Sequence, residues 1–106
     1  MSKRLHIYST NEPDGQCYIV GDKSALLQLA KSLQHAANNE VDFKKYYSGD
    51  GHRYTVIAVR ESDDEVWPML KTTYTDPVFA EQRNEYVDPE NLEVVDFYLQ
   101  EKHKLK

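Results

Sequence analysis

The sequence places an acid and an imidazole together in a glycine-rich turn. In the segment Ser48-Gly49-Asp50-Gly51-His52, Asp50 and His52 lie two residues apart, and flanking glycines let a ligand approach the backbone closely. A carboxylate and an imidazole are groups that general acid–base chemistry uses. Glycine beside aspartate is also typical of a β-hairpin turn, and this interpretation is favoured here. A phosphate-binding loop needs more glycines, or a lysine before a helix, and neither is present.

The sequence holds no recognisable motif for metal binding or for nucleophilic catalysis. The four histidines are far apart and none belongs to a CxxC, HxH or HExxH motif. The single cysteine, Cys17, falls in a β-rich segment, where a small buried thiol is expected. We therefore assign no metal ligand, no cofactor and no catalytic residue, and the sequence favours a protein that is not an enzyme.

Tyrosine is the residue type that most distinguishes this chain from an average small protein, with eight copies beside one tryptophan. Rigid amphipathic rings are enriched at the energetic centres of protein interfaces, so outward-facing rings on a sheet would suit a protein partner. Packing within the sheet remains the alternative, because tyrosine is a good strand residue. The candidate binding residues are Tyr8, Tyr46, Tyr54 and Trp67, together with Asp50 and His52 of the turn.

Composition limits the class of protein. The 106 residues fit one domain spanning residues 1–106. A formal net charge of -5 argues against nucleic acid as a partner. One cysteine cannot form an internal disulfide, which favours the cytoplasm, and no uncharged apolar run reaches the roughly 18 residues of a membrane-spanning helix. The oligomeric state is left open.

The first half of the chain predicts a hairpin followed by a helix. Alternating residues over 5–10 and β-forming residues over 16–20 flank a turn of Asn, Glu, Pro, Asp and Gly. Asp22 is placed to cap a helix over about 23–38, which ends at Asn38-Asn39 because asparagine tolerates the left-handed conformation. The stripe expected to pack on the sheet comprises Leu26, Leu29, Ala30, Leu33 and Ala37.

The second half predicts more strands. A second hairpin is expected over 41–48 and 53–60, with a short edge strand over 66–74 that Pro68 interrupts. A short helix is expected over about 77–86 and a single turn at Pro89. Residues 93–100 fit a strand or a helical face, and their β-branched and aromatic residues favour a strand.

Together these elements predict an α+β fold: a mostly antiparallel sheet of about five to six strands, covered by one main helix and a short second one. Small size, acidic charge and many tyrosines indicate a cytoplasmic accessory protein. It would bind and regulate or inhibit another macromolecule, most simply a protein. The alternative is a binder of small, nucleotide-like molecules, or a small enzyme, with its site near the Gly49–His52 turn and with Trp67 and Tyr74 as walls.

Overall fold

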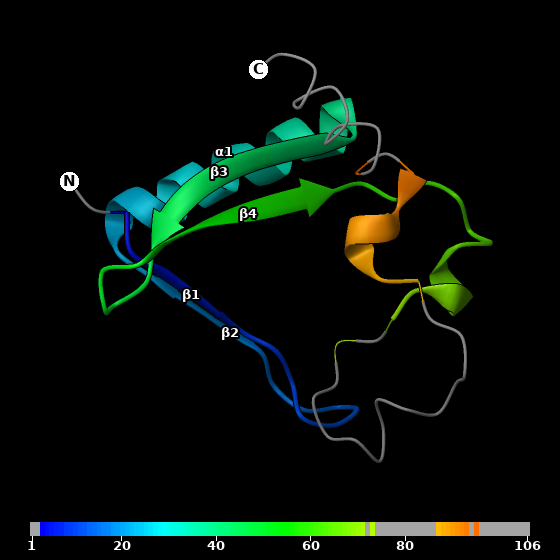
Figure 1. The fold of residues 1–106 in the computed structure, drawn as a ribbon, viewed down its shortest axis with the longest axis horizontal. Coiled ribbons are helices and arrows are strands. Elements are labelled where there is room, and N and C mark those ends of the chain that lie inside the picture. Colours follow the sequence, from blue (N-terminus) through cyan, green and yellow to red (C-terminus); the bar gives the residue numbers. More distant parts are fainter. Residues whose placement is uncertain (1–2, 72, 74–86, 94, 96–106) are drawn as a thin grey trace.

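The described part of the fold consists of two β-hairpins joined by one long helix. The computed structural model describes residues 3–71, 73, 87–93 and 95 (Figure 1). Their order is β1 (Leu5–Tyr8), β2 (Tyr18–Gly21), α1 (Lys23–Asn39), β3 (Val41–Tyr47), β4 (Arg53–Val59) and two 3₁₀ helices, η1 (Trp67–Met69) and η2 (Pro89–Asn91). This order confirms the α+β class, both hairpins and the predicted helix, which extends one residue beyond the predicted end.

Asp22 begins α1 as the sequence predicted. One oxygen of its carboxylate accepts the backbone N–H of Ala25 at 2.8 Å, which satisfies a free amide of the first turn. The other accepts the N–H of Arg4 at 3.1 Å and so ties the helix start to the first hairpin. The helix ends differently from the prediction, because Glu40, and neither asparagine, adopts the positive φ of 80° and donates its N–H to Ala36.

The prediction of one sheet with five to six strands is wrong. In the described part of the chain, β1 pairs only with β2 and β3 only with β4, which gives two separate two-stranded antiparallel sheets. The two hairpins touch where the Tyr47 N–H donates to the Lys3 carbonyl at 2.9 Å, but a single bridge between Arg4 and Tyr47 is all that forms. Beyond this bridge β1 and β2 run away from β3 and β4 (Figure 1).

The predictions for the C-terminal part are corrected where it is described. In place of an edge strand, Trp67–Met69 forms a 3₁₀ helix with proline near its start, a position where the missing N–H costs nothing. Leu70 makes only an isolated bridge with Val87. Glu93 and Val95 have helical backbone where a strand was expected, whereas the turn at Pro89 is confirmed as η2. The predicted helix over 77–86 lies outside the described residues.

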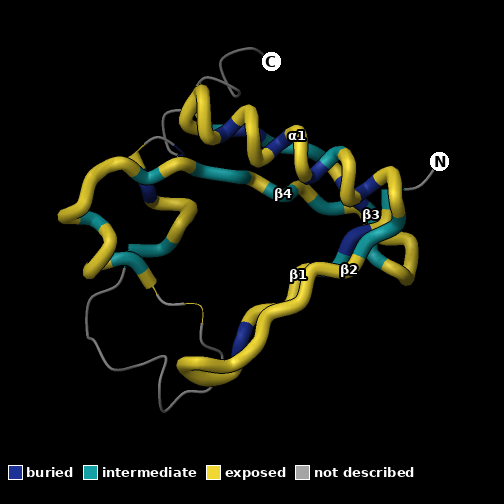
Figure 2. The backbone as a smooth tube through the Cα atoms, turned by 180° about the vertical axis from the view of Figure 1, so that it is seen from behind, coloured by how far each residue is buried: buried dark blue, intermediate teal, exposed yellow. Residues whose placement is uncertain are grey.

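The core lies between α1 and the face of β3 and β4 that it covers. Leu5, Ala25, Leu29 and Tyr46 are buried there, and Tyr54 and Val56 pack against them. Most of β1 and β2 lies outside this core and is exposed (Figure 2). No helix in the described part of the chain has the length and apolarity needed to span a membrane.

The predicted packing face of α1 is wrong except at Leu29. Leu26 is 42% exposed and Leu33 52%, and Ala30 and Ala37 are exposed as well. The residues that face the sheet form the neighbouring stripe, Ala25, Leu29, Ser32 and Ala36. Polar bonds explain the rotation, because Gln28 donates to the Lys45 carbonyl at 3.1 Å and draws the polar side of the helix onto β3.

Candidate functional site: the exposed first hairpin

The Gly49–His52 turn satisfies its own polar groups. The Asp50 carboxylate accepts the Ser48 hydroxyl and, at 3.2 Å, the backbone N–H of His52. The His52 Nδ1 lies 3.2 Å from the other carboxylate oxygen. The hydrogen bond from Ser48, followed by those from His52, lowers the pKa of Asp50. Both side chains are exposed and face each other, so this geometry is that of a closed hairpin turn, with positive φ at Gly51.

His6 joins this turn to the first hairpin. The Gly49 N–H donates to Nε2 of His6 at 2.8 Å, so this nitrogen is an acceptor and the imidazole carries its hydrogen on Nδ1. That hydrogen is directed to the Tyr8 hydroxyl, 2.6 Å away. The two rings meet edge to face, with centroids 5.7 Å apart. His6 therefore holds Tyr8 in place on the surface of the hairpin.

The four aromatic residues proposed from the sequence do not form one surface. Tyr46 is fully buried in the core, and half-buried Tyr54 donates its hydroxyl to the Leu5 carbonyl. Burial, and next the neighbouring Tyr46, raises the pKa of Tyr54. Tyr8 is 50% exposed on β1. Trp67 is exposed too, but η1 lies at the opposite end of the molecule from the turn at 48–52 (Figure 1).

The exposed apolar surface lies instead on both faces of the first hairpin. Ile7 is opposite Ile19 on one face, and Tyr8 is opposite Tyr18 on the other. A two-stranded hairpin is marginally stable in water unless a face is covered, and a contiguous apolar surface of this kind marks an interaction site. The exposed residues are Ile7, Tyr8, Tyr18, Ile19 and Val20, which we call the hairpin surface.

Sequence reasoning found only Tyr8 of this surface. A signal was present, because three consecutive apolar residues from Tyr18 to Val20 supply both faces of a strand. Such a strand needs cover on two sides, yet Tyr18, Ile19 and Val20 are each more than half exposed. Cys17, predicted to be buried, is exposed beside this strand.

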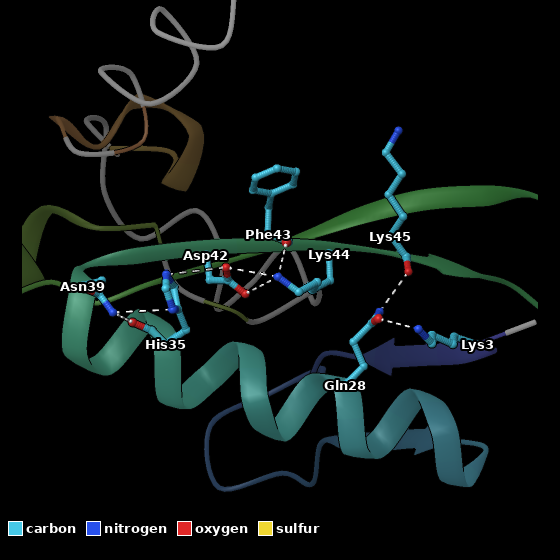
Figure 3. Close-up of polar contacts among 8 residues, drawn as sticks. All are labelled: Lys3, Gln28, His35, Asn39, Asp42, Phe43, Lys44 and Lys45. Atoms are coloured by element: carbon cyan, nitrogen blue, oxygen red, sulfur yellow. Dashed lines mark hydrogen bonds and ion pairs between the residues drawn. The ribbon is translucent and has the colours of Figure 1, made fainter.

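A buried carboxylate links α1 to β3, but its arrangement is not catalytic. Lys44 Nζ lies 3.2 Å from one oxygen of Asp42, and His35 Nε2 lies 4.0 Å from the other (Figure 3). A nucleophilic triad needs the imidazole between hydroxyl and carboxylate, whereas here Ser32, His35 and Lys44 all approach Asp42. Ser32 is also only 2% exposed, so a substrate cannot reach its hydroxyl. The cluster therefore joins helix and strand.

The electrostatics of Asp42 agree with this structural role. Burial is the largest single influence on Asp42 and raises its pKa. The hydrogen bonds from Ser32 and Lys44, together with the electrostatic influence of Lys44 and of the His35 imidazole, outweigh burial and leave the pKa below its usual value. The carboxylate is therefore held in its charged form.

Two of the hollows in the described part of the chain differ in size and lining. The larger, of about 660 Å³, lies between Arg60 and residues 61–69 and 87–93, with an acidic lining that includes Glu40, Glu61 and Asp63. The smaller, of about 250 Å³, is bounded by Leu5, His6, Ile7, Tyr8, Ser48 and Tyr54. Among the described residues no three His, Cys, Asp or Glu side chains are grouped to hold a metal ion.

Comparison with protein-family models, with curated proteins and with solved structures found no match to this chain.

Proposed function

We propose that this chain is an accessory protein of the cytoplasm that binds another protein through the hairpin surface, and regulates or inhibits it. The observation that carries the proposal is the exposure of large apolar side chains on both faces of β1 and β2. Burial of such side chains supplies most of the energy of protein association, and aromatic residues such as Tyr8 and Tyr18 are frequent at the centre of interfaces. An exposed thiol at Cys17 fits a reducing compartment.

The hairpin is also held firmly enough to serve as a binding element. At its base, Asp22 bonds Arg4 and Tyr54 bonds Leu5, while His6 attaches its middle to Gly49. A surface that is positioned before binding loses less conformational freedom when the complex forms. These contacts leave the apolar side chains of Ile7 and Ile19 free for a partner.

Affinity capture tests the proposal. Full-length protein, the Ile19→Thr variant and the Leu27→Ser variant would each be used as bait in a cytoplasmic lysate, with quantitative mass spectrometry of the retained proteins. Ile19→Thr keeps a β-branched residue in the strand, and Leu27 is equally exposed but lies on α1. We expect one protein to be retained by the wild type and by Leu27→Ser and lost with Ile19→Thr. Equal retention by all three baits would contradict the proposal.

A further inference from the structure

The contact between His6 and Gly49 depends on a neutral imidazole. Nε2 of His6 accepts the Gly49 N–H at 2.8 Å, and Nδ1 lies 2.6 Å from the Tyr8 hydroxyl. A neutral imidazole has one acceptor and one donor, and both are used here. Protonation places a second hydrogen on Nε2, where it faces the hydrogen of Gly49, so this bond is lost. The bond to Tyr8 remains, because Nδ1 keeps its hydrogen.

The neighbouring contacts between the two hairpins do not change in this way. Tyr47 donates its N–H to the Lys3 carbonyl at 2.9 Å, and Tyr54 donates its hydroxyl to the Leu5 carbonyl. Burial raises the pKa of Tyr54, so its hydroxyl keeps its hydrogen over the range from about pH 5 to 8 in which histidine changes charge. The base of the first hairpin therefore stays attached when the His6 contact is lost.

The side chains around His6 do not offer a charged imidazole a new partner. Tyr8 of the same strand and Tyr54 of β4 line a pocket with His6 and carry neutral hydroxyls, and Val20 of β2 lies opposite it. Among the described residues none of the ion pairs includes His6. The nearby charged groups are already paired with one another, Arg4 with Asp22 and Asp50 with His52.

The His6 contact lies where the first hairpin leaves the core. Beyond it, β1 and β2 run away from β3 and β4 and are mostly exposed (Figures 1 and 2). The walls of the smaller hollow come from both hairpins, with Ile7 and Tyr8 on one side and Ser48 and Tyr54 on the other. When the bond between His6 and Gly49 is lost, these two walls are free to separate.

From this geometry we propose that His6 is a proton-controlled latch between the two hairpins. The neutral ring holds the first hairpin against the turn at 48–52. Protonation releases it, and the hairpin pivots about its base at Lys3 and Leu5. The hairpin surface therefore takes one position at neutral pH and another at acid pH. The inference concerns the free chain, and it does not depend on a partner protein.

The test follows the Gly49 amide and the His6 ring by NMR in the full chain. As the pH falls from about 8 to about 5, the Gly49 amide signal should shift with the same midpoint as the ring signals of His6. Its protection against hydrogen exchange, corrected for the intrinsic effect of pH on exchange, should fall about fivefold because one hydrogen bond is lost.

The single cysteine supplies a reporter on the moving part. Cys17 is exposed and lies three residues before Val20, which pairs with His6, so it is roughly 10 Å further from the base of the hairpin. A nitroxide spin label on Cys17 broadens the signals of amides near it. We expect the pattern of broadening over β3 and β4 to change with the same midpoint as the His6 ring. The amide signals of α1 serve as the control for folding.

Three variants separate the latch from other effects of pH. His6→Gln keeps an acceptor that does not titrate, because its side-chain oxygen takes the place of Nε2, so it should show the neutral arrangement throughout. His6→Leu has no acceptor and should show the acid arrangement throughout. His52→Asn removes the histidine of the neighbouring turn and should leave the transition in place.

Three results would overturn the proposal. They are no change at Gly49 in the wild type over this pH range, a transition that persists in His6→Gln, or a transition that disappears in His52→Asn, which would assign it to the pair of Asp50 and His52. Each leaves the capture experiment on Ile19 to decide the proposed function separately.

Discussion

Tyr46 and Tyr54 lie side by side in the core, with ring centroids 6.4 Å apart, but their hydroxyl groups differ in what they contact. Tyr54 donates to the Leu5 carbonyl, while the buried hydroxyl of Tyr46 has no hydrogen-bond partner among the described residues. A buried polar group without a partner costs about 1–3 kcal/mol of stability. The sequence could not distinguish the two residues, since both are tyrosines on predicted strands and their hydrogen-bond partners depend on the tertiary structure.

Replacement of each hydroxyl should therefore have opposite effects. We expect Tyr46→Phe to raise the free energy of unfolding by about 1 kcal/mol, because it removes an unsatisfied group. Tyr54→Phe should lower the free energy by about 0.5–1.5 kcal/mol, because it leaves the Leu5 carbonyl without its donor. Urea unfolding of the two variants measures both values, and a loss of stability in Tyr46→Phe would show that its hydroxyl is satisfied.

Asp22 should make stability depend on pH. Its backbone hydrogen bonds with Ala25 and then Arg4 lower its pKa from the usual 3.8. A carboxyl whose pKa is lower in the folded state stabilises the fold above its unfolded pKa, and this contribution is lost as the pH falls through the folded pKa. We expect the wild type to lose stability below about pH 4, and the Asp22→Asn variant to lose less over the same range. Parallel pH profiles from urea unfolding would contradict this role.

Among the secondary-structure elements, α1 shows most clearly which features follow from local sequence and which depend on tertiary contacts. Its start at Asp22 and its length follow from local sequence, and these were predicted correctly. The face that it turns toward the sheet depends on Gln28, whose bond to β3 links residues 17 positions apart and has no local pattern. The same holds for the number of strands per sheet, which is set by the divergence of β1 from β3 after Arg4.

Leu29 and Leu33 test which face of α1 packs on the sheet. Leu29 is buried between α1 and the sheet, so Leu29→Ala should cost about 2–5 kcal/mol. Leu33→Ala, at a position exposed in the free protein, should change the free energy of unfolding by less than about 0.5 kcal/mol. Thermal or urea unfolding measures both losses, and equal losses would indicate that the stripe predicted from the sequence packs on the sheet.

The exposure of the first hairpin could be predicted even less from local sequence. Its strands were predicted, but its lack of cover was not, since exposure is a property of everything that packs around an element. Cys17 shows this, because its place beside β2 indicated burial and the structure exposes it.

A thiol reagent reports this exposure directly. We expect Cys17 to be labelled in the native protein at a rate close to that of a denatured control, since no surrounding structure has to open first. Labelling that occurs only with global unfolding would place the thiol in a core.

The molecule as a whole is more extended than a chain of its length requires. Its Cα radius of gyration is 15.2 Å, against about 13 Å for a compact domain of 100 residues. An open shape with an apolar hairpin at one side is what the proposed binding of a partner protein requires. Net charge argued against nucleic acid as a partner, but the surface that carries the proposal could be recognised only from the three-dimensional arrangement.

The affinity of the captured partner for hairpin variants tests this proposal most directly. Kd would be measured by calorimetry for the wild type, Ile19→Thr and Tyr18→Ala, with the urea midpoint of each free protein as the control for folding. We expect at least one variant to lose about 2 kcal/mol of binding free energy, roughly thirtyfold in Kd, at an unchanged midpoint. Unchanged Kd values in both variants, or losses of affinity that follow losses of stability, would contradict the assignment of β1 and β2 as the binding surface.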